Sequence, residues 1–397
     1  MSQPTSIEAY RGASVLDRSE FNSLVSALAR SGYTVLGPAV RDGAIVFDEI
    51  GGDTDLPIGI TDEQQGGHYR LKPSGAPTLF AYAVGPQSLK THLYPPRTLL
   101  FRARGSSSDF SVDAPSPAPP RRLAFVGARA CELRAMAIQD QVFTGGADAD
   151  PGYAARRANI FIVAVNCGSP AGNCFCLSMG SGPKADADYD LALTEVCNGQ
   201  RHYFVVEYGS AQGKALFDTV PHRAATEKER LAAIDVMRNA EARMGRTLDT
   251  ADLRELLYRN AASPRWDDAA KRCLSCANCT MVCPTCFCST VEDTTSLAGD
   301  TAERWRVWDS CFTLEFSHIH GGSVRKSGAS RYRQWITHKL ASWHDQFGTP
   351  GCVGCGRCIA WCPVGIDITE EVAALRRAEA EGREAKRGVG KSWSPKT

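Results

Sequence analysis

Alternating apolar and polar positions in the first half of the chain predict strands separated by helices. Short apolar runs typical of buried strands occur at 123–127, 159–165 and 203–208, and a helical period fills the first interval through Phe143. The order strand, helix, strand indicates a βαβ unit and a parallel sheet. Further elements are expected before this unit, namely a helix over 18–31 and strands over 33–36, 44–47 and 78–84.

The pattern of the second half is mainly helical. Thr226 and Glu229 fit a capping box, which predicts a helix that ends near Met244 before a glycine. A second helix is expected from Asp249 to Ala261, and a last helix follows Asp367. These helices flank the part of the chain in which most cysteines lie.

Composition and charge narrow the class of protein. The apolar content is 43%, the apolar runs are much shorter than a membrane span, and the first residues lack the apolar region of a signal peptide. We therefore expect a cytoplasmic protein with no membrane contact. The formal net charge of +1 gives no support to nucleic-acid binding, and two bound four-iron clusters would change it to about −3.

Sixteen cysteines in such a chain point to metal rather than to disulfides. The strongest motif is C-x-x-C-x-x-C-x-x-x-C-P, which begins at Cys273 and again at Cys352. Three closely spaced thiolates can bind three corners of a cubane, while the fourth, before proline, reaches the neighbouring cluster. A zinc site is the alternative, but it usually uses two separated C-x-x-C pairs.

The motif therefore predicts two [4Fe-4S] clusters with crossed ligands. One cluster is expected to take Cys273, Cys276, Cys279 and Cys362, and the other Cys352, Cys355, Cys358 and Cys283. The 67 residues from Thr285 to Gly351 separate the motifs far more than in a compact ferredoxin and contain helical stretches over 332–347. We therefore expect a helical dicluster domain.

Composition and motifs together predict an α+β protein, in which an N-terminal α/β region with a partly parallel sheet precedes the helical dicluster ferredoxin-like domain. Residues 105–122 are rich in Ser, Pro and Asp, which disfavours regular structure. The expected segments are 1–104 (α+β), 105–122 (connection), 123–225 (α/β with extra cysteines), 226–382 (helical, with both motifs) and 383–397 (disordered basic tail).

Four further cysteines could hold a third iron-sulfur cluster. Cys131 and Cys167 each follow a strand of the βαβ unit, so both should lie at the carboxyl edge of the sheet. Cys174 and Cys176 lie in the next loop, before a tight glycine-containing loop at 178–183. A zinc site and buried free thiols are the alternatives.

Other candidate residues have less specific patterns. Cys286, Cys288 and Cys311 could be ligands or small buried hydrophobic residues. Cys197 has no partner at ligand spacing, and a lone pair of histidines at 318 and 320 is a weak metal motif. Phosphate-loop, dinucleotide and nucleophile-elbow motifs are absent from the sequence, so catalysis on a substrate by this chain alone is not supported.

Six segments of the sequence resemble a known family, the beta subunits of cytoplasmic sulfhydrogenases, which are NAD(P)-linked nickel-iron hydrogenases. The electron-input subunits of anaerobic sulfite reductases share the pattern. One departure is Ala130 before Cys131, where family members commonly have proline. The segments are Asp55 to Leu71, Gly127 to Phe143, Cys174 to Pro183, Cys273 to Cys288, Arg306 to Phe312 and Gly351 to Ile368.

The resemblance implies an electron-transfer subunit within a larger enzyme. Separate small and large hydrogenase subunits would handle hydrogen, and a flavoprotein subunit would bind NAD(P), which fits the missing nucleotide motif. The eight ferredoxin-type cysteines match the ligands of the family position by position. The alternative that the resemblance leaves open is the electron-input subunit of an anaerobic sulfite reductase.

Overall fold

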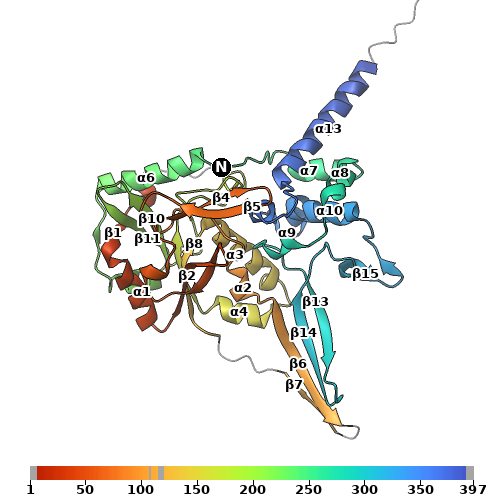
Figure 1. Ribbon diagram of the computed structural model, residues 1–397, viewed down its shortest axis with the longest axis horizontal. Helices are drawn as coiled ribbons and strands as arrows, with labels where there is room; N and C mark the ends of the chain where they lie inside the picture. Colours follow the sequence, from red (N-terminus) through yellow and green to blue (C-terminus); the bar gives the residue numbers. More distant parts are fainter. Residues whose placement is uncertain (1–6, 107–108, 115–119, 390–397) are drawn as a thin grey trace, which may run out of the picture.

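A computed structural model of the protein describes residues 7–106, 109–114 and 120–389. The first part of the chain forms a body around an eight-stranded sheet, and the last part forms a helical region beside it. A long β-arm extends away from both where they meet (Figure 1). The predicted α+β architecture, with a partly parallel sheet followed by a helical region that contains both cysteine motifs, is confirmed.

The large sheet has the strand order β12-β1-β11-β10-β9-β8-β2-β3. Its centre is parallel, because β8 pairs in parallel with β9 and with β2, and β9 with β10. The pairs toward both edges are antiparallel. The strands are β1 (Ser14–Asp17), β2 (Thr34–Arg41), β3 (Ala44–Glu49), β8 (Leu123–Ala128), β9 (Ile160–Val165), β10 (Leu191–Cys197), β11 (His202–Tyr208) and β12 (Arg223–Ala224).

Helices cover both faces of this sheet because its central strands are apolar on both sides. On one face, α1 (Phe21–Arg30) and α5 (Ala211–Phe217) bury Leu24 and Phe217 against Phe204. On the other, α3 (Ala130–Phe143) and α4 (Pro151–Arg157) bury Met136 and Tyr153. The predicted βαβ unit is β8, α3 and β9, so Cys131 and Cys167 follow its strands at the carboxyl edge.

The prediction of a strand over 78–84 is wrong, because this segment is an irregular loop. Side chains, rather than a neighbouring strand, satisfy its backbone groups. The Leu79 and Phe80 N–H groups donate to the Glu195 carboxylate at 2.7 and 2.9 Å, and the Arg129 guanidinium donates to the Phe80 and Tyr82 carbonyls. A run of apolar residues cannot reveal such long-range partners, because its burial is the same in either arrangement.

The arm is a four-stranded antiparallel sheet with the order β13-β14-β6-β7. Its strands are β6 (Arg97–Ser106), β7 (Asp109–Asp113), β13 (Ser289–Thr295) and β14 (Thr301–Trp308). Part of the connection expected over 105–122 is therefore a strand: Phe110 and Val112 alternate with polar residues, and β7 pairs with β6 as an edge strand. Residues 107–108 and 115–119 of that expected connection lie outside the described residues.

The helical region is built from short helices around the two cysteine motifs. Tyr332, Trp335 and Ile336 are buried at helical spacing on α10 and pack beside α8, with Trp266 of α8 next to Tyr332. Helix α6 (Glu227–Ala242) precedes this region and packs against the sheet body (Figure 1). The helices of the region are α7 (Leu253–Arg259), α8 (Arg265–Arg272), α9 (Asn278–Met281), α10 (Gly328–Thr337), a π-helical turn (His338–Ser342), α11 (Trp343–Phe347), α12 (Arg357–Ala360) and the longer α13 (Ile368–Val389).

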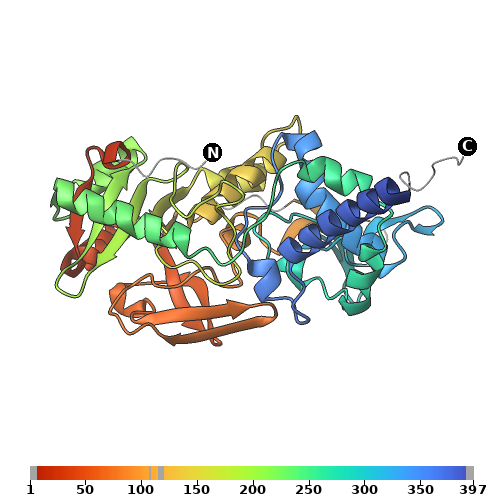
Figure 2. The same ribbon diagram turned by 90° about the horizontal axis from the view of Figure 1, so that it is seen from above.

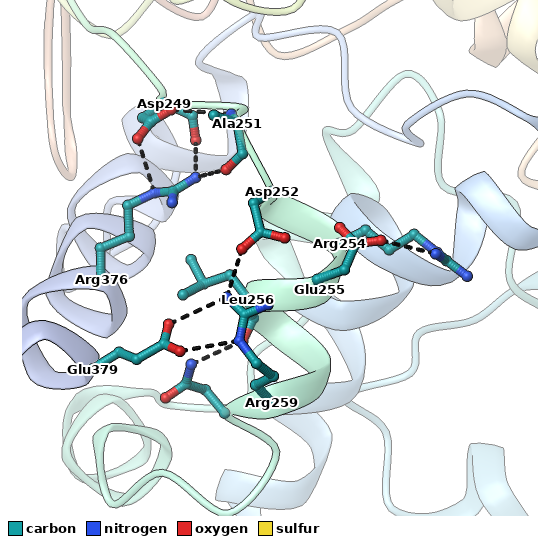
Figure 3. A network of polar contacts seen from close by, with 10 residues as sticks. Asp249, Ala251, Asp252, Arg254, Glu255, Leu256, Arg259, Arg376 and Glu379 are labelled. Carbon is teal, nitrogen blue, oxygen red and sulfur yellow. Dashed lines mark hydrogen bonds and ion pairs between the residues drawn. The ribbon is translucent and has the colours of Figure 1, made fainter. Parts of the chain in front are cut away.

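Two helix boundaries differ from the expected ones. Helix α7 begins after Asp252, because Asp249 instead accepts the Ala251 N–H and forms an ion pair with Arg376 of α13. Arg259 of α7 pairs with Glu379 of α13, so α13 has polar contacts both with α7 and with the segment before it (Figure 3). Helix α13 continues past residue 383, where Ala, Glu, Lys and Arg are strong helix formers, and residues 390–397 of the expected tail lie outside the described residues.

A small hairpin connects the two bodies. Strands β4 (Ile60–Gln65) and β5 (His68–Pro73) lie alongside the junction (Figure 2), and the Gly67 N–H at their turn donates to the Ile359 carbonyl of α12 at 3.0 Å. A side chain at Gly67 would place its Cβ 2.8 Å from the Cys362 carbonyl. Within the described residues, none of the helices combines the length and apolar character needed to cross a membrane.

Candidate iron-sulfur site

The two cysteine motifs adopt the same loop geometry. In each, the residue before the second cysteine and the residue after it have positive φ: Ser275 (52°) and Ala277 (66°) in the first motif, Gly354 (62°) and Gly356 (74°) in the second. The third cysteine then lies in a short helix, α9 or α12, and these helices contact each other. Left-handed residues at both positions curl the chain so that successive thiols face the same side.

The first motif and Cys362 line one apolar cavity. Phe312, Tyr332 and Trp335 form part of its wall, and the thiols that line it include those of Cys273, Cys276, Cys279 and Cys362, with Cys358 of the second motif at its border. The Ser275 N–H donates to the Cys273 sulfur at 3.4 Å, and the Ile366 N–H donates to the Cys362 sulfur at 3.3 Å. Burial, together with the neighbouring thiols, raises the pKa of Cys279 well above its usual range.

The second motif lies beside Cys283 of the first. Cys358 is half-buried and lies near the thiols of Cys352, Cys355 and Cys283, and loss of water around its sulfur, together with these thiols, raises its pKa. The fourth cysteine of each motif therefore lies next to the first three of the other motif, which is the crossed arrangement that the spacing predicts. Whether these thiols are ligands stays a prediction at this point.

The residues present fit a four-iron cluster. The first group offers four thiols in apolar surroundings, and backbone N–H groups point at two of its sulfurs. The second group also offers four thiols, with the Gly354 N–H at the Cys352 sulfur, and hydrogen bonds of this kind are typical of iron-sulfur sites. Among the described residues, no three His, Cys, Asp or Glu side chains converge as a single bound ion would need. When bound, such clusters accept and release single electrons.

Lys339, in the π-helical turn, lies at the second group. Its ammonium donates to the Cys283 sulfur at 3.0 Å, the Thr285 hydroxyl at 2.9 Å and the Gly351 carbonyl at 3.1 Å. Burial opposes its charge, but the sulfurs of Cys283, Cys286 and Cys352 outweigh burial and raise its pKa. Lys339 lies outside both cysteine motifs. The sequence gives one indication that it is buried: it lies four residues from both Trp335 and Trp343, which are themselves buried.

The four cysteines of the α/β region also come together. Cys131, Cys167, Cys174 and Cys176 line a second apolar cavity, to which Cys355 of the second motif contributes as well. Burial raises the pKa of each of the four thiols. The predicted meeting at the carboxyl edge of the sheet therefore occurs.

This cavity is in direct contact with the second motif. The Phe175 N–H donates to the Gly354 carbonyl at 2.8 Å, and the Ser181 hydroxyl donates to the Val353 carbonyl at 2.6 Å. The loop that contains Ser181 is held back on Cys176, because the Ser181 N–H donates to the Cys176 carbonyl at 3.0 Å. The expected tight loop thus shapes this cavity.

Cys286, Cys288 and Cys311 gather where the arm begins. Strands β13 and β14 bring Cys288 next to Cys311, because the Asp309 N–H donates to the Cys288 carbonyl, and the two thiols share a hydrogen bond. The Cys286 thiol is likewise hydrogen-bonded to Cys283, which lowers the pKa of Cys283. Burial of Lys90 nearby lowers its pKa to about 8.

The remaining candidates lie away from these groups. His318 belongs to an exposed hairpin, β15 (His318–Ile319) with β16 (Gly322–Ser323), and His320 is at its exposed turn. Cys197 ends β10 opposite His202, at the carboxyl edge of the sheet, but it is not among the residues that line the cavity of Cys131 and Cys167.

Comparison with known proteins identifies relatives of this chain. Residues 272–366, which contain both motifs, match the family described as a 4Fe-4S dicluster domain. Over 258 residues, the chain is 31% identical to the sulfhydrogenase 2 subunit beta of Pyrococcus furiosus, an alignment that covers 63% of this chain and 73% of that protein. No solved structure matches the chain.

Proposed function

Since this chain belongs to the family of sulfhydrogenase beta subunits, we propose that it is the iron-sulfur electron-transfer subunit of a nickel-iron hydrogenase complex. The observation that carries the proposal is the convergence of two four-thiol groups in the segment that matches the dicluster family. Electrons would pass between these clusters and a flavoprotein subunit that binds NAD(P). Small and large hydrogenase subunits would complete the complex.

We assign one [4Fe-4S] cluster to each group, with the crossed ligands that the motifs predict. The chain's own residues hold the thiols at fixed positions, exclude water with aromatic side chains and donate N–H groups to the sulfurs. Because the groups share a wall, in which Cys358 borders the first cavity, the distance between clusters would be short enough for electron exchange. The ligands are Cys273, Cys276, Cys279 and Cys362 for the first cluster and Cys352, Cys355, Cys358 and Cys283 for the second.

We also propose a third cluster, bound by Cys131, Cys167, Cys174 and Cys176. Its support is the shared apolar cavity and the contact of that cavity with Cys355. A cluster there would extend the electron path from the dicluster region into the sheet body. The second cluster would then lie between the other two, and the flavoprotein subunit would dock near the first or the third cluster.

The test is anaerobic purification of the whole complex with counts of iron and acid-labile sulfide per chain. About eight irons per copy of this chain support two clusters and about twelve support three, after subtraction of the metal of the other subunits. Cys276→Ser should disturb the first cluster and Cys131→Ser the third, whereas Cys197→Ser, the matched control, should leave the count unchanged. An unchanged count in Cys276→Ser would contradict the ligand assignment.

The partner assignment needs a separate readout. The complex should contain nickel and flavin and should reduce NAD(P) with hydrogen. A complex without nickel, or one that contains sirohaem, would contradict the hydrogenase assignment and favour a sulfite reductase instead. The iron count would still stand in that case, so the two proposals fail independently.

A further inference from the structure

The two cluster sites differ in their buried charge. The wall of the first cavity is aromatic and aliphatic, with Phe312, Tyr332 and Trp335 next to the thiols. The second site has the Lys339 ammonium 3.0 Å from the sulfur of Cys283. Lys339 is only 4% exposed, so water screens its charge poorly.

The hydrogen bonds of Lys339 match its charged form. An ammonium has three donors and no acceptor. The three partners of this nitrogen, the Cys283 sulfur, the Thr285 hydroxyl and the Gly351 carbonyl, can all accept. No carboxylate occurs among the hydrogen-bond or ion-pair partners found for Lys339 in the described part of the chain, so its charge is not neutralised by an acidic side chain.

A second buried cation near this site is neutralised. The Arg357 guanidinium, which precedes Cys358, forms an ion pair with the Glu132 carboxylate at 2.8 Å, and both side chains are 1% exposed. It also donates to the Gly85 and Gln87 carbonyls. A third buried cation, Lys90, lies near Cys283 and donates to the Met281 and Cys286 carbonyls, and burial lowers its pKa to about 8. Lys339 differs from both cations because its ammonium has no acidic partner among the described contacts and donates directly to the sulfur of a cluster ligand.

We propose that Lys339 raises the reduction potential of the cluster held by Cys352, Cys355, Cys358 and Cys283 above that of the other dicluster site. The inference rests on the proposed function, because it requires both clusters. Reduction adds one negative charge to a cluster, and a nearby cation stabilises the charge-rich form. The hydrogen bond to a ligand sulfur acts in the same direction.

This difference in reduction potential would determine which cluster of the chain is reduced first. The first electron would occupy the second site, which also borders the cavity of the proposed third cluster through Cys355. The first site, whose cavity wall is aromatic and aliphatic, would be reduced at a lower potential. Lys339 is thus a positioning residue: it acts through the cluster ligand Cys283 and affects which cluster is reduced first.

The test is a redox titration of the complex followed by electron paramagnetic resonance. Lys339→Met and Lys339→Gln should move one cluster midpoint to a more negative potential and leave the other in place, whereas Lys339→Arg should stay close to wild type. Lys72→Met, which removes an exposed cation from β5, is the matched control and should move neither. The same titration on Cys276→Ser identifies the signal of the second site.

Two outcomes would overturn the inference. One is an unchanged midpoint in a neutral variant that retains both clusters. The other is loss of iron from both neutral variants, which would give Lys339 a purely structural role. The wild-type iron count is measured on the same preparation, so a failure of the two-cluster proposal is recognised separately.

Discussion

Backbone conformation at single residues decides whether the cysteine loops can close. The second motif uses glycine at both positions with positive φ, and these glycines also allow close approach of the loop that contains Cys174 and Cys176. A Cβ on Gly354 would lie 2.6 Å from the Phe175 backbone, and one on Gly356 would lie 2.5 Å from the Asn173 carbonyl oxygen. The first motif has Ser275 and Ala277 at the equivalent positions, so it accepts strain of roughly 1–3 kcal/mol per residue.

Gly356→Ala should destabilise the protein strongly. Left-handed backbone costs alanine roughly 1–2 kcal/mol, and the contact with Asn173 adds an overpacking cost of roughly 1–3 kcal/mol. Gly348→Ala is the control, because Gly348 has a φ of 68° but no atom within 4 Å of an added Cβ. Anaerobic thermal unfolding should show a clearly larger drop in Tm for Gly356→Ala. Equal drops would mean that the close approach contributes nothing.

At the scale of elements, helix α6 depends on a charged cap. Glu229 accepts the Thr226 N–H at 3.0 Å and hydrogen bonds from Arg223 and Arg201, and its side chain is 3% exposed. The predicted capping box is therefore present, and the arginines add to it. Helix α6 packs Ala233 and Ile234 against the sheet, so its loss would expose that edge of the core.

Glu229→Gln should lower the free energy of unfolding by roughly 1–3 kcal/mol at neutral pH, because charged hydrogen bonds are lost. The hydrogen bonds from Arg223 and the other donors hold the pKa of Glu229 below its usual range. This stabilisation is thus complete above the pKa of the unfolded state, near 4.5, and is lost as the pH falls below it. Chemical unfolding of both proteins at several pH values checks this. A stability difference that persists at low pH would refute the charged cap.

The sequence predicts elements well where a single segment contains the whole signal. The helix expected over 18–31 and the strands of the βαβ unit follow from apolar periodicity, and both are present. Pairing between distant segments is different: β6 and β14 of the arm lie about 200 residues apart, and neither segment encodes its partner. The backbone of 78–84 bonds to Glu195 and Arg129 for the same reason.

The residues of the candidate site likewise include some that the sequence predicts and one that it does not. Cysteine spacing was enough to predict which thiols meet, since the geometry of a cluster fixes that spacing. Lys339 was not predicted, because its partner Cys283 lies 56 residues away and a lysine within a helical stretch normally faces solvent. The spacing of Lys339 from the buried Trp335 and Trp343 places it on the buried face of a helical stretch but does not name Cys283 as its partner, whereas a ligand motif contains its own partners.

At the scale of the whole molecule, the sheet body and the helical region meet at a buried ion pair. Glu132 lies in the first turn of α3 in the sheet body, where it also accepts the Arg129 N–H, and Arg357 begins α12 in the second motif. The guanidinium reaches the loop at Gly85 and Gln87 as well, so three segments depend on this side chain. The position of the second motif against the sheet body is therefore set by buried polar contacts as well as by apolar packing.

A double-mutant cycle on Glu132 and Arg357 measures this junction. Glu132→Gln should cost roughly 3–5 kcal/mol, because it leaves the buried arginine without its counter-charge. Arg357→Met alone should cost a similar amount, and the double variant should cost less than the sum, with a coupling energy of roughly 1–3 kcal/mol. The exposed pair Glu63 and Lys72, treated in the same way, should give no more than about 1 kcal/mol. Denaturant unfolding of the anaerobic protein provides the energies, and additive effects at the buried pair would show that the two bodies are held together by packing alone.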